Sequence, residues 1–147
     1  MGAVLALPTV AALVVPIVIG VFDPWTIGIS PWGVPVLAVG AVVIGWTVTD
    51  FFTLGQGTLA PWDPPRSLVV TGLFSLCRNP MYWGVVTVVV GWAITLGSPL
   101  VAVFAGVLVV AFHIRVVRYE EPWAARAFPD QWPEYAAAVP RWIPRIR

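Results

Sequence analysis

Apolar residues fill four long stretches of this chain, and short polar segments rich in proline and glycine separate them. The stretches are residues 3–22, 32–54, 81–96 and 100–117. A helix needs about 20 predominantly apolar residues to cross a bilayer, and the last two stretches are near the lower limit of that length. The pattern therefore predicts an all-α integral membrane protein with about four transmembrane helices, folded as a single domain over residues 1–147.

The breaks between the stretches predict how the helices are connected. Gly97-Ser98-Pro99 is a tight break, so we expect the third and fourth helices to form an antiparallel hairpin. Three prolines between Gly55 and Arg66 exclude a regular helix there. Pro16 is expected to kink the first helix. Residues 118–128 are amphipathic, as expected where the fourth helix runs out of the membrane. The proline-rich remainder, residues 129–147, predicts short helical pieces on the cytoplasmic surface, and residues 67–76 are expected to form a short interfacial piece before Arg78.

Composition agrees with a membrane protein. Hydrophobic residues make up 59% of the chain and charged residues 10%, and the mean hydropathy is +0.89. A soluble domain carries about 25% charged residues. The single cysteine, Cys77, excludes an intrachain disulfide. No basic run alternates with aromatic residues, which argues against nucleic-acid binding, and no cluster of Cys and His predicts a metal site.

The basic residues are distributed unevenly along the chain. All eight are arginines, and none precedes residue 66: Arg66, Arg78, Arg115, Arg118, Arg126, Arg141, Arg145 and Arg147. With four spans, these arginines fall on one side of the membrane, and the opposite side carries Asp23 and no basic residue. The positive-inside rule then places both termini in the cytoplasm. We expect the plasma membrane as the location.

Two polar signals bracket an apolar stretch that holds no charged residue. The segment Arg78-Asn79-Pro80-Met81-Tyr82-Trp83-Gly84 begins it, and Glu120-Glu121 follows its end. A helical hairpin would bring both signals to one membrane face. Arginine and the start of a helix favour anionic groups, and carboxylates suit an ammonium, a sulfonium or a ribose diol. The pattern predicts a water-accessible pocket for a zwitterionic ligand with sugar hydroxyls.

The same residues permit a simpler interpretation. Arg78 with Glu120 or Glu121 can form a salt bridge that fastens the hairpin at the interface and needs no ligand, and the spacing leaves both interpretations open. His113 and Asp50 are further candidates for proton transfer. Each is also compatible with an ordinary interfacial position.

The segment from residue 55 to residue 144 carries a combined pattern of motifs. It includes Gly55-x-Gly57-Thr58, Gly72-Leu73-Phe74, Arg78-Asn79-Pro80-Met81-Tyr82, Glu120-Glu121 and Val139-Pro140-Arg141. This pattern resembles the isoprenylcysteine carboxyl methyltransferase and phospholipid methyltransferase superfamily of integral membrane methyltransferases. The continuation Trp83-Gly84 and the string Gly91-Trp92-Ala93-Ile94 are most similar to the phosphatidylethanolamine N-methyltransferase branch.

The resemblance implies a methyltransferase that takes S-adenosyl-L-methionine from the cytoplasmic side. Its acceptor would come from the bilayer, as a phospholipid amine or an isoprenyl or lipid carboxylate. The cofactor-binding residues implied are Gly55, Gly57, Arg78, Asn79, Pro80, Tyr82, Glu120 and Glu121. Arg78, Tyr82 and Glu121 are the implied catalytic residues, and Arg115, Arg118 and Trp83 are the residues expected to bind the acceptor.

Some positions depart from the family pattern. Asn79 stands where the carboxyl methyltransferase branch has histidine, and Phe128-Pro129 stands where Phe-Gly is usual. These changes weaken the case for a prenylcysteine substrate and leave the cofactor assignment unaltered. Two other classes share the hairpin: a reductase-like enzyme or other membrane accessory protein, and a non-enzymatic interaction subunit. Binding of S-adenosylhomocysteine would separate the methyltransferase from both.

Overall fold

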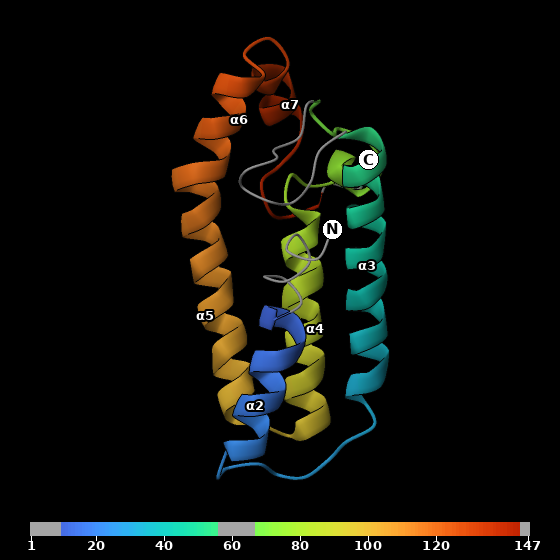
Figure 1. Cartoon of the computed structure of the whole chain (residues 1–147), viewed down its shortest axis with the longest axis vertical. Helices are drawn as coiled ribbons and strands as arrows, with labels where there is room; N and C mark the ends of the chain where they lie inside the picture. The colour runs from blue at the N-terminus through green and yellow to red at the C-terminus, as the bar shows by residue number, and fades with distance from the viewer. Residues whose placement is uncertain (1–9, 56–66, 145–147) are drawn as a thin grey trace.

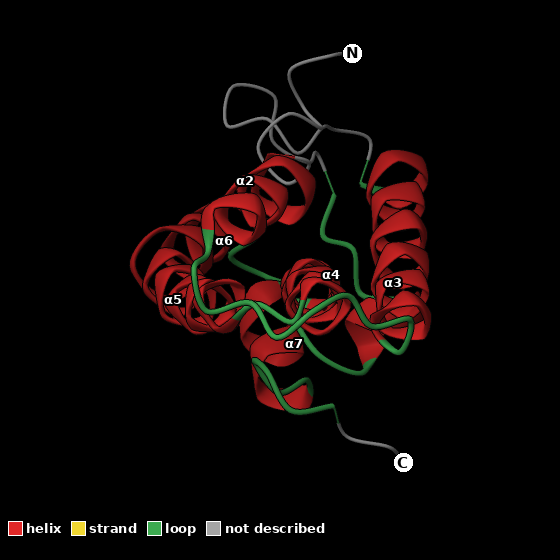
Figure 2. Ribbon diagram, turned by 90° about the horizontal axis from the view of Figure 1, so that it is seen from below, coloured by secondary structure: helices red, strands yellow, loops and turns green. Residues whose placement is uncertain are grey.

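The computed structural model describes residues 10–55 and 67–144, and this part of the chain contains helices, turns and loops without a strand. The predicted all-α class is confirmed for these residues. Helices α2 (Val15–Phe22), α3 (Gly33–Leu54), α4 (Pro80–Leu96) and α5 (Pro99–Arg115) run roughly along the long axis of the molecule (Figure 1). Seen along that axis, α4 lies between α3 and α5 (Figure 2).

Two helical stretches are long and apolar enough to cross a membrane. They are Gly33–Leu54, with 22 residues, and the continuous stretch Pro99–Ala127, with 29 residues. Many of their large apolar side chains are exposed, for example Val42 and Val103. Such an exposed apolar surface is typical of a protein that contacts lipid. Two further apolar helices are shorter, so the count of four spans stays a prediction.

The fourth helix continues beyond the predicted membrane span, as expected from the amphipathic residues 118–128. After α5 the chain forms a π-helical turn, Val116–Glu120, and then α6 (Glu121–Ala127). The charged residues after position 117 had marked the end of the apolar pattern. Their polarity does not interrupt the backbone hydrogen bonds, so the helix carries Glu120 and Glu121 on its own extension.

Each π-helical turn precedes a proline. Pro122 lies in the first turn of α6, and Pro16 lies in the first turn of α2, directly after the π-helical turn Val10–Val14. In a regular helix the proline ring would clash with the carbonyl four residues earlier. The wider π turn accommodates the ring. The irregularity that the sequence predicts at Pro16 is therefore a π-helical turn.

The predicted hairpin of the third and fourth helices is confirmed. Helix α4 ends at Gly97, whose φ of +56° is in the left-handed region that suits glycine. Ser98 then caps α5, because its hydroxyl accepts a hydrogen bond from the backbone N–H of Val101 at 3.2 Å. The turn is therefore fixed by its own residues.

Asp23 fastens the loop after α2 to this turn. Its buried carboxylate accepts hydrogen bonds from the backbone N–H groups of Leu100, at 3.0 Å, and Trp25, at 2.9 Å, and from the Ser98 hydroxyl. Burial raises the pKa of the Asp23 carboxyl, but these hydrogen bonds outweigh burial and hold the pKa below its usual range. Asp23 thus has a structural role at the end of the molecule remote from the Arg78 motif.

Short elements gather at the opposite end of the molecule, one beside the end of α3 and one beside α6 (Figure 1). They are the 3₁₀ turn Gly72–Ser75 and helix α7 (Trp132–Ala138). The Tyr135 hydroxyl donates a hydrogen bond to the Phe74 carbonyl at 2.8 Å and joins the two. These elements correspond to the short interfacial pieces that the sequence predicts on either side of the hairpin.

Helices α3 and α4 approach closely because glycines lie between them. A Cβ added to Gly40 would lie 2.7 Å from Val88 Cγ2 and 2.8 Å from Val88 N. A Cβ added to Gly84 would lie 2.7 Å from Ile44 Cγ1. Small residues at such positions let membrane helices pack backbone against backbone.

We expect Gly40→Ala to lower the stability of the folded protein by about 1–3 kcal/mol, because the added methyl group overpacks the α3–α4 contact. Gly45→Ala, on the same helix, is the matched control, since a Cβ there meets nothing within 4 Å. The control should be neutral or stabilising by about 0.5–1 kcal/mol. Thermal unfolding in detergent measures both, and equal midpoints for the two variants would refute close packing at Gly40.

Candidate active site at the start of α4

The Arg78-Asn79 motif is held by the C-terminal part of the chain. The Arg78 backbone N–H donates to the Pro140 carbonyl at 2.9 Å, and the Asn79 side-chain amide donates to the Arg141 carbonyl at 3.1 Å. Pro80 then starts α4, where its fixed φ suits the first helical turn. The motif is therefore positioned by a segment that lies 62 residues later in sequence.

Glu121 joins two arginines. Its Oε1 lies 2.9 Å from Arg78 Nη1, and its two oxygens accept from Arg141 Nε and Nη2, each at 2.7 Å. The Arg78 and Glu121 side chains are 13% and 16% exposed, and Arg141 is 34% exposed. Hydrogen bonding to Glu121 raises the pKa of Arg141. The predicted meeting of Arg78 with a glutamate of the pair is confirmed for Glu121.

This triad keeps an unused binding capacity. Two guanidinium groups and one carboxylate leave one net positive charge. Arg78 Nε is buried and has no hydrogen-bond partner among the described residues. A buried donor without a partner costs free energy unless a ligand or water satisfies it. The salt bridge of the simpler interpretation is present, but that interpretation leaves this donor unexplained.

Glu120 belongs to a second, more exposed cluster. Its Oε1 accepts hydrogen bonds from the Tyr82 hydroxyl and from Arg115 Nε, the latter at 2.7 Å, and Arg115 Nε also lies 3.1 Å from the Tyr82 oxygen. The ring of Tyr82 packs against Phe112, with centroids 4.3 Å apart. The second oxygen, Oε2, accepts no hydrogen bond from the described residues, so it is open to a ligand.

The segment Val139–Pro144, here called the C-terminal strap, crosses from α4 to α5. The Trp83 indole donates to the Trp142 carbonyl at 2.8 Å, and the Trp142 indole donates to His113 Nδ1 at 3.1 Å. The second bond requires His113 to be unprotonated at Nδ1. His113 therefore anchors the strap, and its proposed use in proton transfer has to compete with that bond.

The remaining predicted residues lie outside the two clusters. Arg118 is exposed and forms no ion pair with a described residue. Gly55 ends α3, where its N–H donates to the Phe51 carbonyl at 3.0 Å, and Gly57 lies outside the described residues. Asp50 has a buried Oδ2 next to Gly72, away from the triad, and this oxygen has no hydrogen-bond partner among the described residues.

Arg141 and Trp142 are the residues that the predicted site omitted. Arg141 supplies half of the charge around Glu121, and Trp142 touches the rings of Tyr82 and Trp83. The string Val139-Pro140-Arg141 carried a signal, because an arginine between apolar residues and prolines needs a partner. The sequence does not say which carboxylate provides it.

The residues present fit S-adenosyl-L-methionine. Its carboxylate matches the free Nε of Arg78 and the surplus positive charge of the triad. Its ammonium and ribose hydroxyls match the open Oε2 of Glu120. Within the described part of the chain, no three metal-ligating side chains come together.

The sequence model of the phospholipid methyltransferase family matches residues 32–131, which include α3, the motif and both glutamates. The chain belongs to this family. The match begins at the second apolar helix and ends before the C-terminal strap. The expected resemblance to this superfamily is confirmed.

The curated proteins that are similar to this chain include two kinds of methyltransferase and a metal-resistance protein. Protein-S-isoprenylcysteine O-methyltransferase B of Arabidopsis thaliana is 34% identical over 55% of this chain and 41% of its own length. Phosphatidylethanolamine N-methyltransferase of Mus musculus is 34% identical over 60% of this chain and 48% of its own length. Cobalt-zinc-cadmium resistance protein CzcN of Cupriavidus metallidurans is 31% identical over 78% of this chain and 52% of its own length.

The chain spans about half the length of the curated relatives it matches. No solved structure matches it. The relatives therefore identify the family, and the geometry of the site has to support any activity assigned to this chain.

Proposed function

We propose that this chain is an S-adenosyl-L-methionine-dependent methyltransferase acting on a lipophilic acceptor at the cytoplasmic face of the membrane. Family membership supports methyl transfer as the reaction class. The observation that carries the proposal is the buried Nε of Arg78, which has no partner among the described residues, in a triad with one surplus positive charge. A charge-assisted donor in this state is what a carboxylate-bearing ligand requires.

Each residue of the site has a stated task in this proposal. Arg78 holds the cofactor carboxylate through Nε, and Glu121 and Arg141 fix the plane of its guanidinium. Glu120 accepts a hydrogen bond from the ammonium or a ribose hydroxyl at Oε2. Asn79 and Pro80 set the start of α4. When bound, S-adenosyl-L-methionine supplies a methyl group activated by its positively charged sulfur.

The acceptor side involves Tyr82 and the arginines of the fourth helix. The Tyr82 hydroxyl and Arg115 hold Glu120 in place. An amine acceptor has to lose its proton before its nitrogen can attack the methyl group. A carboxylate acceptor needs no base, and the charges of Arg115 and Arg118 favour an anionic group.

The proposal includes the arrangement in the membrane. We infer one membrane domain with four spans, both termini and the site on the cytoplasmic side, in the plasma membrane. Asp23 is bonded to the turn between α4 and α5, and α6, which carries Arg126, lies at the opposite end of the molecule (Figure 1). The positive-inside rule supports this orientation.

Calorimetric titration of S-adenosylhomocysteine into the folded protein in lipid nanodiscs tests the proposal. We expect one site with a dissociation constant between about 1 µM and 1 mM, the usual range for enzyme ligands. Transfer of label from S-adenosyl-L-methionine into a total lipid extract should follow. Absence of binding by folded protein would exclude the methyltransferase in favour of an accessory or interaction protein. Binding with label appearing only in water-soluble products would exclude a lipophilic acceptor.

A further inference from the structure

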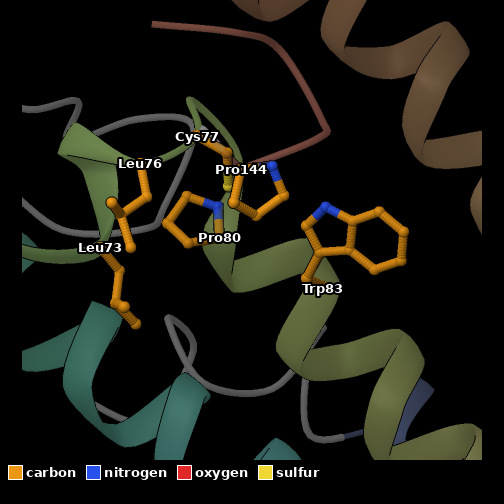
Figure 3. Close-up of a pocket in the computed structure, with 6 residues that line it drawn as sticks. All are labelled: Leu73, Leu76, Cys77, Pro80, Trp83 and Pro144. Atoms are coloured by element: carbon orange, nitrogen blue, oxygen red, sulfur yellow. The ribbon is translucent and has the colours of Figure 1, made fainter. Parts of the chain in front are cut away.

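A wholly apolar groove lies beside the motif. Its volume is about 290 Å³, and Figure 3 shows the side chains around it. They are Leu73, Leu76, Cys77, Pro80, Trp83 and Pro144. The groove draws on three separate parts of the chain: the 3₁₀ turn with the residues after it, the first turn of α4, and the end of the C-terminal strap.

The lining offers nothing to a polar ligand. The prolines have no N–H, and the Trp83 indole N–H is already bonded to the Trp142 carbonyl at 2.8 Å. Ligand pockets usually measure about 300–1,000 Å³ and include a few polar groups. This groove is at the small end and lacks such groups, so it suits a length of hydrocarbon and neither a polar headgroup nor the cofactor.

The position of the groove relates it to the site. Cys77 directly precedes Arg78-Asn79, and Pro80 directly follows them, so the two cluster residues lie between two groove residues in the chain. Leu76 and Trp83 are 37% and 41% exposed, which leaves the groove open at the surface. A hydrocarbon chain that enters it from the bilayer would bring its polar end to the motif.

We propose that this groove holds one hydrocarbon chain of the methyl acceptor. This inference rests on the proposed function and narrows its substrate class. The acceptor is a lipid whose nucleophile lies within a few bonds of the end of an alkyl or isoprenyl chain, since two groove residues, Cys77 and Pro80, flank Arg78-Asn79 in the chain. The competing explanation for the apolar groove is that bulk bilayer lipid contacts it without binding at a defined site.

The single cysteine of the chain gives a direct test. Ethyl-, octyl- and dodecylmaleimide are reacted with Cys77 in phosphatidylcholine nanodiscs. Because burial raises the pKa of this thiol, the reaction is run at about pH 9. The matched control is Cys77→Ala with Ile114→Cys, which moves the thiol to an exposed position on α5. Partitioning of the reagent into lipid affects both proteins equally.

We expect the rate at Cys77 to saturate with octylmaleimide concentration and the rate at the control to rise linearly. The octyl-to-ethyl rate ratio should be about fivefold or more higher at Cys77, and Leu76→Trp, which fills the groove, should abolish the difference. Leu73→Trp is the second filling variant should Leu76→Trp fold poorly. If the kinetics are linear and the octyl-to-ethyl rate ratios are equal at Cys77 and at the control cysteine, the groove contacts bulk lipid only. That result would overturn the proposal of a defined hydrocarbon site.

A second measurement connects the groove to the acceptor. Leu76→Trp should lower label transfer into a total lipid extract at least about tenfold, while S-adenosylhomocysteine binding stays within about twofold of the parent. Ile114→Trp is the control and should change neither. Saturable labelling with undiminished transfer in Leu76→Trp would overturn the assignment to the acceptor. The maleimide reaction needs no methyl transfer, so its failure is distinguishable from failure of the proposed function.

Discussion

Glu121→Ala should destabilise the protein by about 3 kcal/mol and abolish binding of S-adenosylhomocysteine. The change removes the only carboxylate between Arg78 and Arg141 among the described residues and leaves two positive charges close together. Breaking a buried ion pair typically costs about 3–5 kcal/mol. The lower value applies here because Arg141 is one-third exposed and solvent screens its charge. Chemical unfolding in detergent, with a parallel binding titration, measures both effects.

Glu120→Ala is the control for this prediction. Glu120 and its partner Arg115 are 37% and 51% exposed, so their pair should contribute at most about 1 kcal/mol to stability. Loss of Oε2 should still weaken ligand binding roughly ten- to a hundredfold. Glu121→Ala is thus expected to lower both stability and ligand binding, whereas Glu120→Ala is expected to lower ligand binding with little effect on stability. Equal stability of the two variants would show that the triad does not hold the strap, and unchanged binding in both would remove the glutamate pair from the site.

The ends of α3 and α4 were predictable because residues of special conformation mark them. Pro31 and Gly55 bound α3, and Pro80 and Gly97 bound α4, so the observed helices begin and end within one residue of the predicted stretches. The meeting of Arg78 with the glutamates followed from the hairpin. These predictions depend on the conformational preferences of proline and glycine and on the tight turn between α4 and α5, and the sequence shows both.

The π-helical form of the chain after α5 and the C-terminal strap were not predictable in the same way. Polar residues after Val117 signal water, but backbone hydrogen bonds continue through them in the π-helical turn. The second partner of Glu121 is one of the seven arginines other than Arg78, and only the folded chain selects Arg141. The apolar groove likewise combines residues 73–83 with Pro144, and no periodic pattern links those positions.

Arg78→Lys should weaken S-adenosylhomocysteine binding roughly ten- to a hundredfold, although the positive charge is kept. Lysine has no planar fork, so it cannot contact Glu121 through one nitrogen and offer a ligand the donor now at Nε. The Arg78 guanidinium also lies over the Trp132 ring, with Cζ 5.6 Å from its centroid, and the ammonium group would stack less well. Calorimetric titration of the folded variant measures the change.

The matched control is Arg126→Lys, on the exposed surface of α6, where no described residue pairs with the arginine. It should bind and transfer methyl groups as the parent does, because a positive charge on this side of the membrane is all that it supplies. Full activity in Arg78→Lys would show that Arg78, like Arg126, supplies only a positive charge on one side of the membrane. Its buried Nε would then have no function in ligand binding. Lost methyl transfer with intact cofactor binding would move Arg78 to the acceptor side, next to the apolar groove. Lost cofactor binding, the expected result, would place the free donor of the triad on the cofactor carboxylate.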